Sequence, residues 1–141
     1  MSPDPSQRTA WKLSAPLGPE WQDRTSYTYQ WADERVRLTI TRLAPKDLRD
    51  PTLAGMIERR EKKFATDPGD KTLLKRFFDI NQHEAAELGV LTTLGEGRFV
   101  SFNLLVRDAG GVYDCVMTGP EKFRSAMETS WRAFVDGARF A

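Results

Sequence analysis

Apolar and polar residues alternate along two segments near the carboxyl end of the chain, 99–107 and 112–118, and a turn-forming Asp-Ala-Gly-Gly sequence separates them. Such segments, rich in β-branched and aromatic residues, are typical of a β-hairpin. The pattern favours the register in which Arg107 faces Val112 across the four intervening residues, because a shift by one residue would mix Asp114 with the apolar face. In the favoured register, six apolar side chains share one face: Phe102, Leu104, Val106, Tyr113, Cys115 and Met117.

A helical pattern follows the hairpin. Pro120 suits the first turn of a helix, where a missing N–H costs nothing, and Gly137 offers a left-handed stop at the other end. This helix must bury its apolar side, and the apolar face of the hairpin is the nearest partner. The apolar residues recur at three- and four-residue spacing: Phe123, Met127, Trp131, Phe134 and Val135.

Further elements are predicted upstream. Asp50 and Pro51 are typical of a helix start, with Asp50 as the cap, and Leu53, Met56, Ile57 and Phe64 mark the buried side of that helix. The charged run 58–63 is interpreted as its solvated face. The remaining pattern predicts strands over 11–17, 25–31, 36–43, 73–80 and, interrupted at Gly89, 85–94.

Most neighbouring segments are joined by short turns, which favours antiparallel pairing. The order of strands, helix, strands and helix predicts an α+β fold, a mostly antiparallel sheet of about six strands with two main helices packed on one face. Residues 1–10 are predicted to be a loose arm. Residues 11–141 are predicted to be a single domain, because a chain of 141 residues has the size of one domain.

The strand over 98–107 carries apolar side chains on both faces, since Phe99 and Leu105 point away from the face that holds Phe102 and Leu104. A sheet covered on one side only does not need a second apolar face. Either another element of the chain covers it, or a partner does. The alternating aromatic residues Tyr27, Tyr29 and Trp31 add bulk nearby in the sequence.

Composition excludes some classes of function. The 21 basic and 20 acidic residues nearly balance, whereas nucleic-acid binding calls for a basic excess or stripe. No segment has the ~20 apolar residues that span a bilayer, and the amino terminus lacks the apolar core of a signal peptide. A single cysteine, Cys115, agrees with a reducing compartment. We therefore predict a cytoplasmic protein that neither binds nucleic acid nor inserts into a membrane.

Candidate chemistry is sparse. His83, the sole histidine, could be argued as a base or a metal ligand, but zinc sites usually draw several His and Cys ligands, so an exposed loop histidine is the simpler interpretation. Cys115 falls on the predicted core face and is interpreted as a small buried hydrophobe. Gly95 and Gly97 lack the third glycine of a dinucleotide motif. We predict no enzyme, no catalytic residue, no cofactor and no metal site.

Three short motifs occur in order along the chain: LGPEWQDRT at residues 17–25, LTITR at 38–42 and WRAFV at 131–135. Together they resemble the DcrB-related (DUF1795) family, whose members have a Mog1/PsbP-like fold with a curved sheet. The first is close to the family's opening motif, the second is similar to one of its strands, and the third to its closing helix. The resemblance spans nearly the whole predicted domain.

Cytoplasmic members of this family include the Eag chaperones of type VI secretion, homodimers that cradle the amino-terminal transmembrane helices of an effector before export. The resemblance therefore implies a non-enzymatic chaperone or adaptor, an effector with amino-terminal apolar helices as its partner, and a homodimer. Another protein-binding module of the same fold, an immunity protein or an assembly factor, is the alternative.

The second face of the sheet is the binding surface that this function would need. Its apolar groups would cover client side chains, and its small polar groups would bond to client backbone exposed by small residues. Relatives tend to carry glutamine-rich sequence on the strand that holds Ser101 and Asn103, which changes the expected contacts but not the surface. The predicted partner-binding residues are Thr39, Thr41, Phe99, Ser101, Asn103, Leu105 and Val116.

Overall fold

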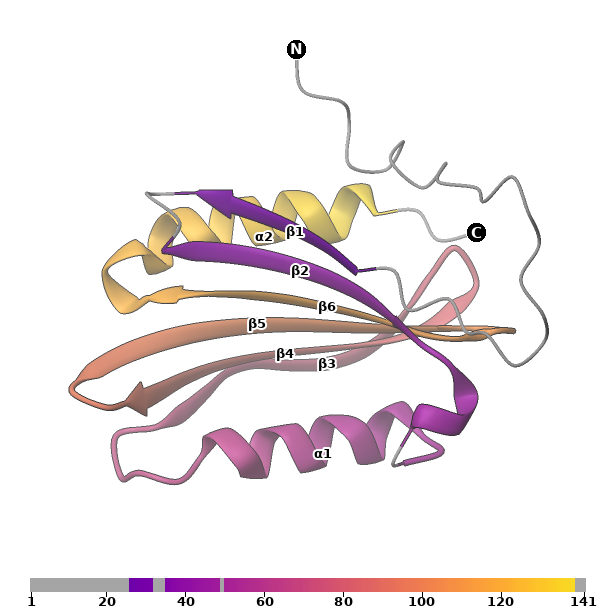
Figure 1. Cartoon of the computed structure of the whole chain (residues 1–141), viewed down its shortest axis with the longest axis horizontal. Helices are drawn as coiled ribbons and strands as arrows, with labels where there is room; N and C mark the ends of the chain where they lie inside the picture. The colour runs from indigo at the N-terminus through magenta and orange to yellow at the C-terminus, as the bar shows by residue number, and fades with distance from the viewer. Residues whose placement is uncertain (1–25, 32–34, 49, 139–141) are drawn as a thin grey trace, which may run out of the picture.

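The computed structural model describes residues 26–31, 35–48 and 50–138. Among these residues, six strands form one antiparallel sheet in the order β1-β2-β6-β5-β4-β3 (Figure 1). The strands are β1 (Ser26–Trp31), β2 (Val36–Leu43), β3 (Lys71–Ile80), β4 (His83–Leu94), β5 (Gly97–Asp108) and β6 (Gly111–Pro120). The helices are α1 (Leu53–Phe64) and α2 (Arg124–Gly137), with the short 3-10 turns η2 (Pro45–Asp47) and η3 (Glu121–Phe123). The predicted arm over 1–10, the strand over 11–17 and the motif over 17–25 lie outside the described residues.

The α+β class is confirmed, as is the register of the closing hairpin. Arg107 pairs with Val112, and Leu104 pairs with Cys115. The turn is tighter than predicted, because Asp108 and Gly111 also pair. Gly111 has φ of 142°, in the region that favours glycine, and a side chain there would run into the carbonyl of Leu43.

The strand β4 runs without interruption through Gly89, so the predicted break there is wrong. Gly89 pairs with Leu74 on one side and with Phe102 on the other. A Cβ on Gly89 would lie 3.0 Å from the ring of Phe102, which means that the ring occupies the space a side chain would need. An aromatic ring over a strand glycine compensates for the missing side chain, and the ladder continues.

The helix α1 begins two residues later than the predicted start at Pro51, so that prediction is wrong in detail. The cap is Thr52, whose Oγ1 accepts a hydrogen bond from the Gly55 amide at 3.0 Å. The carboxylate of Asp50, the predicted cap, instead accepts a bond from Arg59 at 3.3 Å. Two residues of this stretch can cap a helix, and the tertiary contact decides between them.

The helix α2 also begins later than predicted. Pro120 is the last residue of β6 rather than the first of the helix, and η3 intervenes before α2 starts at Arg124. The apolar stripe is as predicted, because Met127, Trp131 and Val135 are the buried residues of α2.

The two helices cover opposite faces of the sheet (Figure 1). On one face, Met127 and Trp131 of α2 join a buried cluster with Phe102 and Leu104. On the other face, α1 places its buried residues on a second cluster that includes Leu105. This arrangement differs from the prediction that both helices share one face, and it decides between the two alternatives for the second apolar face. Over β4 and β5, another element of the chain covers it.

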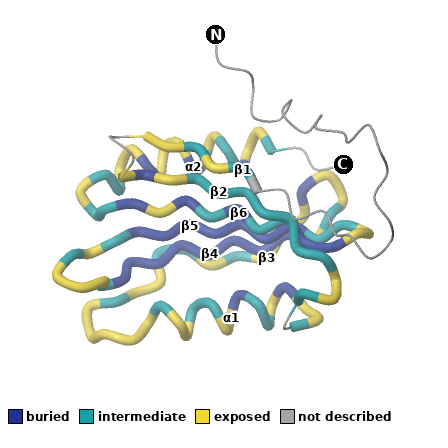
Figure 2. Tube along the Cα trace, in the orientation of Figure 1, coloured by how far each residue is buried: buried dark blue, intermediate teal, exposed yellow. Residues whose placement is uncertain are grey.

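Burial follows from this layering. The residues of β4 and β5 are buried over most of their length, whereas the edge strand β3 alternates between exposed and half-buried positions (Figure 2). A strand that is apolar on both faces is typical of a sheet covered on both sides. The doubly apolar sequence of β5 therefore reflects its place beneath both helices.

A partly buried ion pair joins β2 to the end of β5. Both guanidinium nitrogens of Arg42 donate to the carboxylate of Asp108, at 2.8 and 3.0 Å, and the Gly110 amide donates to the same carboxylate at 2.8 Å. Burial opposes the ionisation of Asp108, but these bonds outweigh it, so the pKa of Asp108 lies below its ordinary value. The carboxylate therefore contributes stability above pH ~4, which is lost as the pH falls through the lowered pKa.

The substitution Asp108→Asn is expected to lower the free energy of unfolding by about 1–3 kcal/mol at neutral pH. The difference from the natural protein should begin to shrink below pH ~3.9, the ordinary pKa of an aspartate, and it should disappear as the pH falls through the lowered pKa of Asp108. Urea unfolding over a series of acidic pH values measures it, with Glu96→Gln in the exposed β4–β5 turn as the control. A difference that stays constant across the acidic range would contradict the lowered pKa.

Candidate functional site

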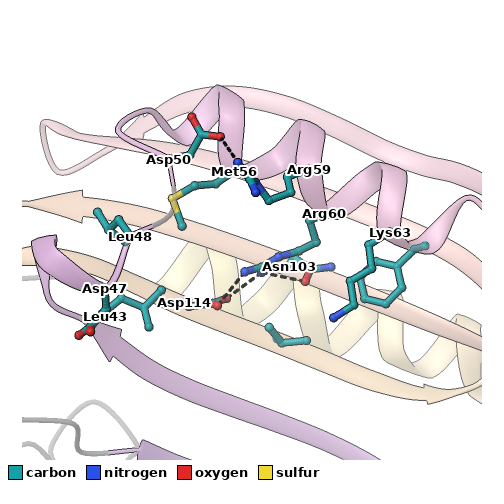
Figure 3. A pocket seen from close by; sticks show the side chains of 12 residues that line it. Leu43, Asp47, Leu48, Asp50, Met56, Arg59, Arg60, Lys63, Asn103 and Asp114 are labelled. Atoms are coloured by element: carbon teal, nitrogen blue, oxygen red, sulfur yellow. Dashed lines mark hydrogen bonds and ion pairs between the residues drawn. The ribbon is translucent and has the colours of Figure 1, made fainter.

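A groove of about 650 Å³ runs beside α1 on the face of the sheet that α1 covers (Figure 3). We call it the α1 groove. One wall is α1 itself, and the floor comes from β5 and β6. It is lined by Leu43, Asp47, Leu48, Asp50, Met56, Arg59, Arg60, Lys63, Phe64, Asn103, Asp114 and Val116.

The groove exists because α1 sits to one side of the sheet. Leu53 and Ile57, the fully buried residues of α1, pack into the cluster that holds Ala86, Leu88 and Leu105 of β4 and β5. The helix therefore lies mainly against β4. On the same face, the sheet continues past the helix through β6 and β2. The groove lies where the side of α1 meets this part of the sheet.

A polar bridge crosses the floor of the groove. The guanidinium of Arg60, on α1, donates to both carboxylate oxygens of Asp114 on β6, each at 2.8 Å. It also donates to the Asn103 side-chain oxygen at 3.1 Å. The amide nitrogen of Asn103 in turn donates to the Leu88 carbonyl and to Ser101 Oγ, both at 3.2 Å. These bonds tie α1 to β6 and satisfy the buried polar groups beneath it.

Apolar side chains surround this bridge. Val116 is half-buried on the floor, and Phe64 of α1 also lines the groove. Met56 projects from α1, and Leu43 and Leu48 lie at the end near η2 (Figure 3). The groove therefore offers apolar contact along its length around one polar crossing. A surface of this kind can hold an apolar segment that carries a few small or polar residues.

Threonine side chains continue the surface across β2 and β1. Thr39 pairs with Val116 on one side and with Thr28 on the other, so these three residues form a row on the groove face. Thr41 lies two residues along β2, on the same face and opposite Asp114. Thr39 and Thr41 are half-buried, and Thr28 is exposed. Thr28 and Thr39 therefore place hydroxyl groups beside the apolar floor.

All seven predicted partner-binding residues lie on this face, as the strand pairing shows. Only some of these residues are accessible to a partner. Thr39, Thr41 and Val116 lie on the open part, and Phe99 is half-buried opposite Pro120. The expected exposure of the other three residues is wrong, because α1 covers them. Their exposed fractions are 0% for Leu105, 1% for Asn103 and 3% for Ser101.

The sequence pattern did not predict that α1 forms one wall of the groove. Met56 and Phe64 were predicted to face the core, and Arg60 and Lys63 were assigned to a solvated face, yet all four line the groove. Their spacing places them on one side of the helix, which is a signal present in the sequence. The partner of Arg60 is 54 residues away on β6, so the local pattern holds no sign of it.

Neither His83 nor Cys115, the two residues considered for chemistry, lines the α1 groove. Among the described residues, no group of three or more His, Cys, Asp or Glu side chains could hold a metal ion. Cys115 is fully buried, as predicted, and burial, with a smaller effect of the Asp114 charge, raises the pKa of its thiol far above the ordinary value. His83 is half-buried at the start of β4.

None of the helices in the described part of the chain is both long and apolar enough to cross a bilayer.

No protein-family model matches this sequence, and no curated protein matches it. A solved structure is similar: the Pseudomonas aeruginosa protein PA94, a protein of unknown function described as a candidate regulator. The two structures superimpose with a TM-score of 0.71 over 93% of this chain and 95% of PA94, at 16% sequence identity. At that identity the likeness shows a shared α+β fold and carries no function with it.

Proposed function

We propose that this protein is a non-enzymatic chaperone or adaptor that binds an apolar helical segment along the α1 groove. Its client would be the amino-terminal transmembrane region of a type VI secretion effector, shielded in the cytoplasm before export. The α1 groove carries the proposal, because it places apolar side chains and threonine hydroxyls on one open surface. The resemblance to the DcrB-related family supports the choice of client.

The dimensions suit a short helical segment. The 12 residues of α1 extend for about 18 Å, so the groove beside it is long enough for about three turns of a client helix. Apolar client side chains would rest against Val116 and Met56. Where small client residues expose the backbone, Thr39 would donate a hydrogen bond to a carbonyl.

Energetics favour two grooves acting together. Each large apolar side chain that is fully buried contributes about 1.5–3 kcal/mol, so three of them supply roughly 5–9 kcal/mol. Association costs about 4–15 kcal/mol in lost freedom of motion, so a single groove binds one segment weakly, with an affinity that a peptide titration still measures. A homodimer that presents two grooves to two segments of one effector would overcome this, because the second contact is intramolecular.

Co-expression tests the proposal. An effector with apolar amino-terminal segments is expected to be soluble only when this protein is present. The substitution Val116→Asp should reduce the recovered complex at least tenfold, because it sets an unpaired carboxylate against the apolar client. Val116 is half-buried, so the variant keeps its fold. Soluble effector and co-purified complex are measured on the same gel.

The matched control is Ser130→Asp on the exposed side of α2, which should leave the complex unchanged. Equal effector solubility with and without the protein would overturn the chaperone function. Binding to a folded effector domain that lacks the apolar segments would instead favour an immunity protein of the same fold.

A further inference from the structure

Two of the three cationic side chains that line the α1 groove are paired with a carboxylate. Arg59 pairs with Asp50 at 3.3 Å and Arg60 pairs with Asp114 at 2.8 Å. Lys63 is exposed and has no carboxylate within ion-pair distance among the described residues. The cation without an ion pair therefore lines the groove where α1 ends.

The two ends of the groove are lined by residues of opposite charge. Lys63 lines the end where α1 stops, and Asp47 lines the opposite end. The carbonyl groups at the end of α1 carry about half a negative charge, which Lys62 offsets. The Asp70 carboxylate near the same end accepts hydrogen bonds from the amides of Thr66, Asp67 and Thr93, and it makes no ion pair with Lys63.

We infer that Lys63 selects client segments with an acidic carboxyl-terminal end and sets their direction in the groove. This inference rests on the proposed function, because it concerns the segment bound in the same groove. The carboxyl end of a helix is the negative end of its dipole, so a carboxylate there and the dipole act together on Lys63. The bound segment then runs parallel to α1.

The effect is moderate, because the charge is exposed. An exposed ion pair together with a helix-end interaction corresponds to a preference of about three- to tenfold in affinity. Because exposed charges are screened by salt, the preference should largely disappear at an ionic strength of ~1 M. Apolar contact would still supply most of the binding.

Two peptides test the inference on the full-length protein. Both share an apolar helical core of about 12 residues, the length of α1, and have acetylated and amidated ends. One carries two glutamates at its carboxyl end and the other carries two glutamines. The natural protein is expected to bind the glutamate peptide about three- to tenfold more tightly, and Lys63→Glu should reverse the preference. Affinities are measured by fluorescence anisotropy of labelled peptides.

The control variant is Lys122→Glu, which makes the same charge change on an exposed residue of η3 that does not line the groove. It should alter the preference much less than Lys63→Glu does. An equal effect of the two variants, or equal affinity of the natural protein for both peptides, would overturn the inference while the groove still binds. If neither peptide binds, both the inference and the proposed function fail.

Discussion

Leu105→Asp is expected to unfold the protein. Leu105 is fully buried in the cluster that α1 covers with Leu53 and Ile57. Its paired residue on the neighbouring strand β6 is Asp114. A carboxylate there would have no cationic partner and would face a second negative charge. The cost is several kcal/mol, out of a total stability of about 5–15 kcal/mol for a typical domain. Circular dichroism and size-exclusion chromatography measure the loss.

The matched variant is Leu105→Ala, which leaves a cavity and should lower the free energy of unfolding by about 2–5 kcal/mol. Val116→Asp makes the same charge change on the same face, yet should fold, because Val116 is half-buried beside the groove. If Leu105→Asp folds with the stability of the natural protein, α1 does not cover this part of the sheet. The groove beside α1 would then lie elsewhere.

Trp131→Ala should have the largest effect on the opposite face. The Trp131 ring stacks on Phe102 at a centroid distance of 5.8 Å, and its Nε1 donates to Glu87 at 2.6 Å. Trp131 is 1% exposed and Glu87 is 0% exposed. Loss of the ring should cost about 3–5 kcal/mol, and Glu87 also loses a donor. Urea unfolding followed by circular dichroism measures it.

Trp131→Phe separates the two contributions. It keeps an aromatic ring against Phe102 but removes the N–H that Glu87 accepts. The expected loss is about 1–3 kcal/mol, clearly less than for alanine. In this variant Glu87 keeps its hydrogen bond from Arg76 and its ion pair with Arg132 at 3.5 Å. Equal losses for phenylalanine and alanine would mean that stacking contributes little, contrary to the packing described above.

Local patterns in the sequence predict much of this fold. The register of the β5–β6 hairpin follows from alternation and turn residues within about twenty positions, and the structure confirms it. The strand β2 has the predicted bounds. These features depend on short-range periodicity, which a single sequence records directly. The start of α1 was less certain, because both Asp50 and Thr52 are suitable caps.

The position of α1 could not be predicted in the same way. Amphipathicity shows that a helix buries one side, but not which face of a sheet receives it. The signal was the second apolar face of β5, for which cover by the chain and cover by a partner remained equal alternatives. Ser101 and Asn103 were assigned to a partner for this reason. Asn103 instead accepts a hydrogen bond from Arg60 of α1 and donates to Ser101 Oγ and to the Leu88 carbonyl.

The central claim is that an apolar segment binds in the α1 groove, and backbone amide NMR shifts test it most directly. The natural protein is titrated with the apolar peptide that ends in two glutamates. The largest shift changes are expected at Thr39, Val116 and Met56, which border the groove, with Glu128 on the outer side of α2 unchanged. Changes centred on α2, or no changes at a saturating peptide concentration, would contradict the account.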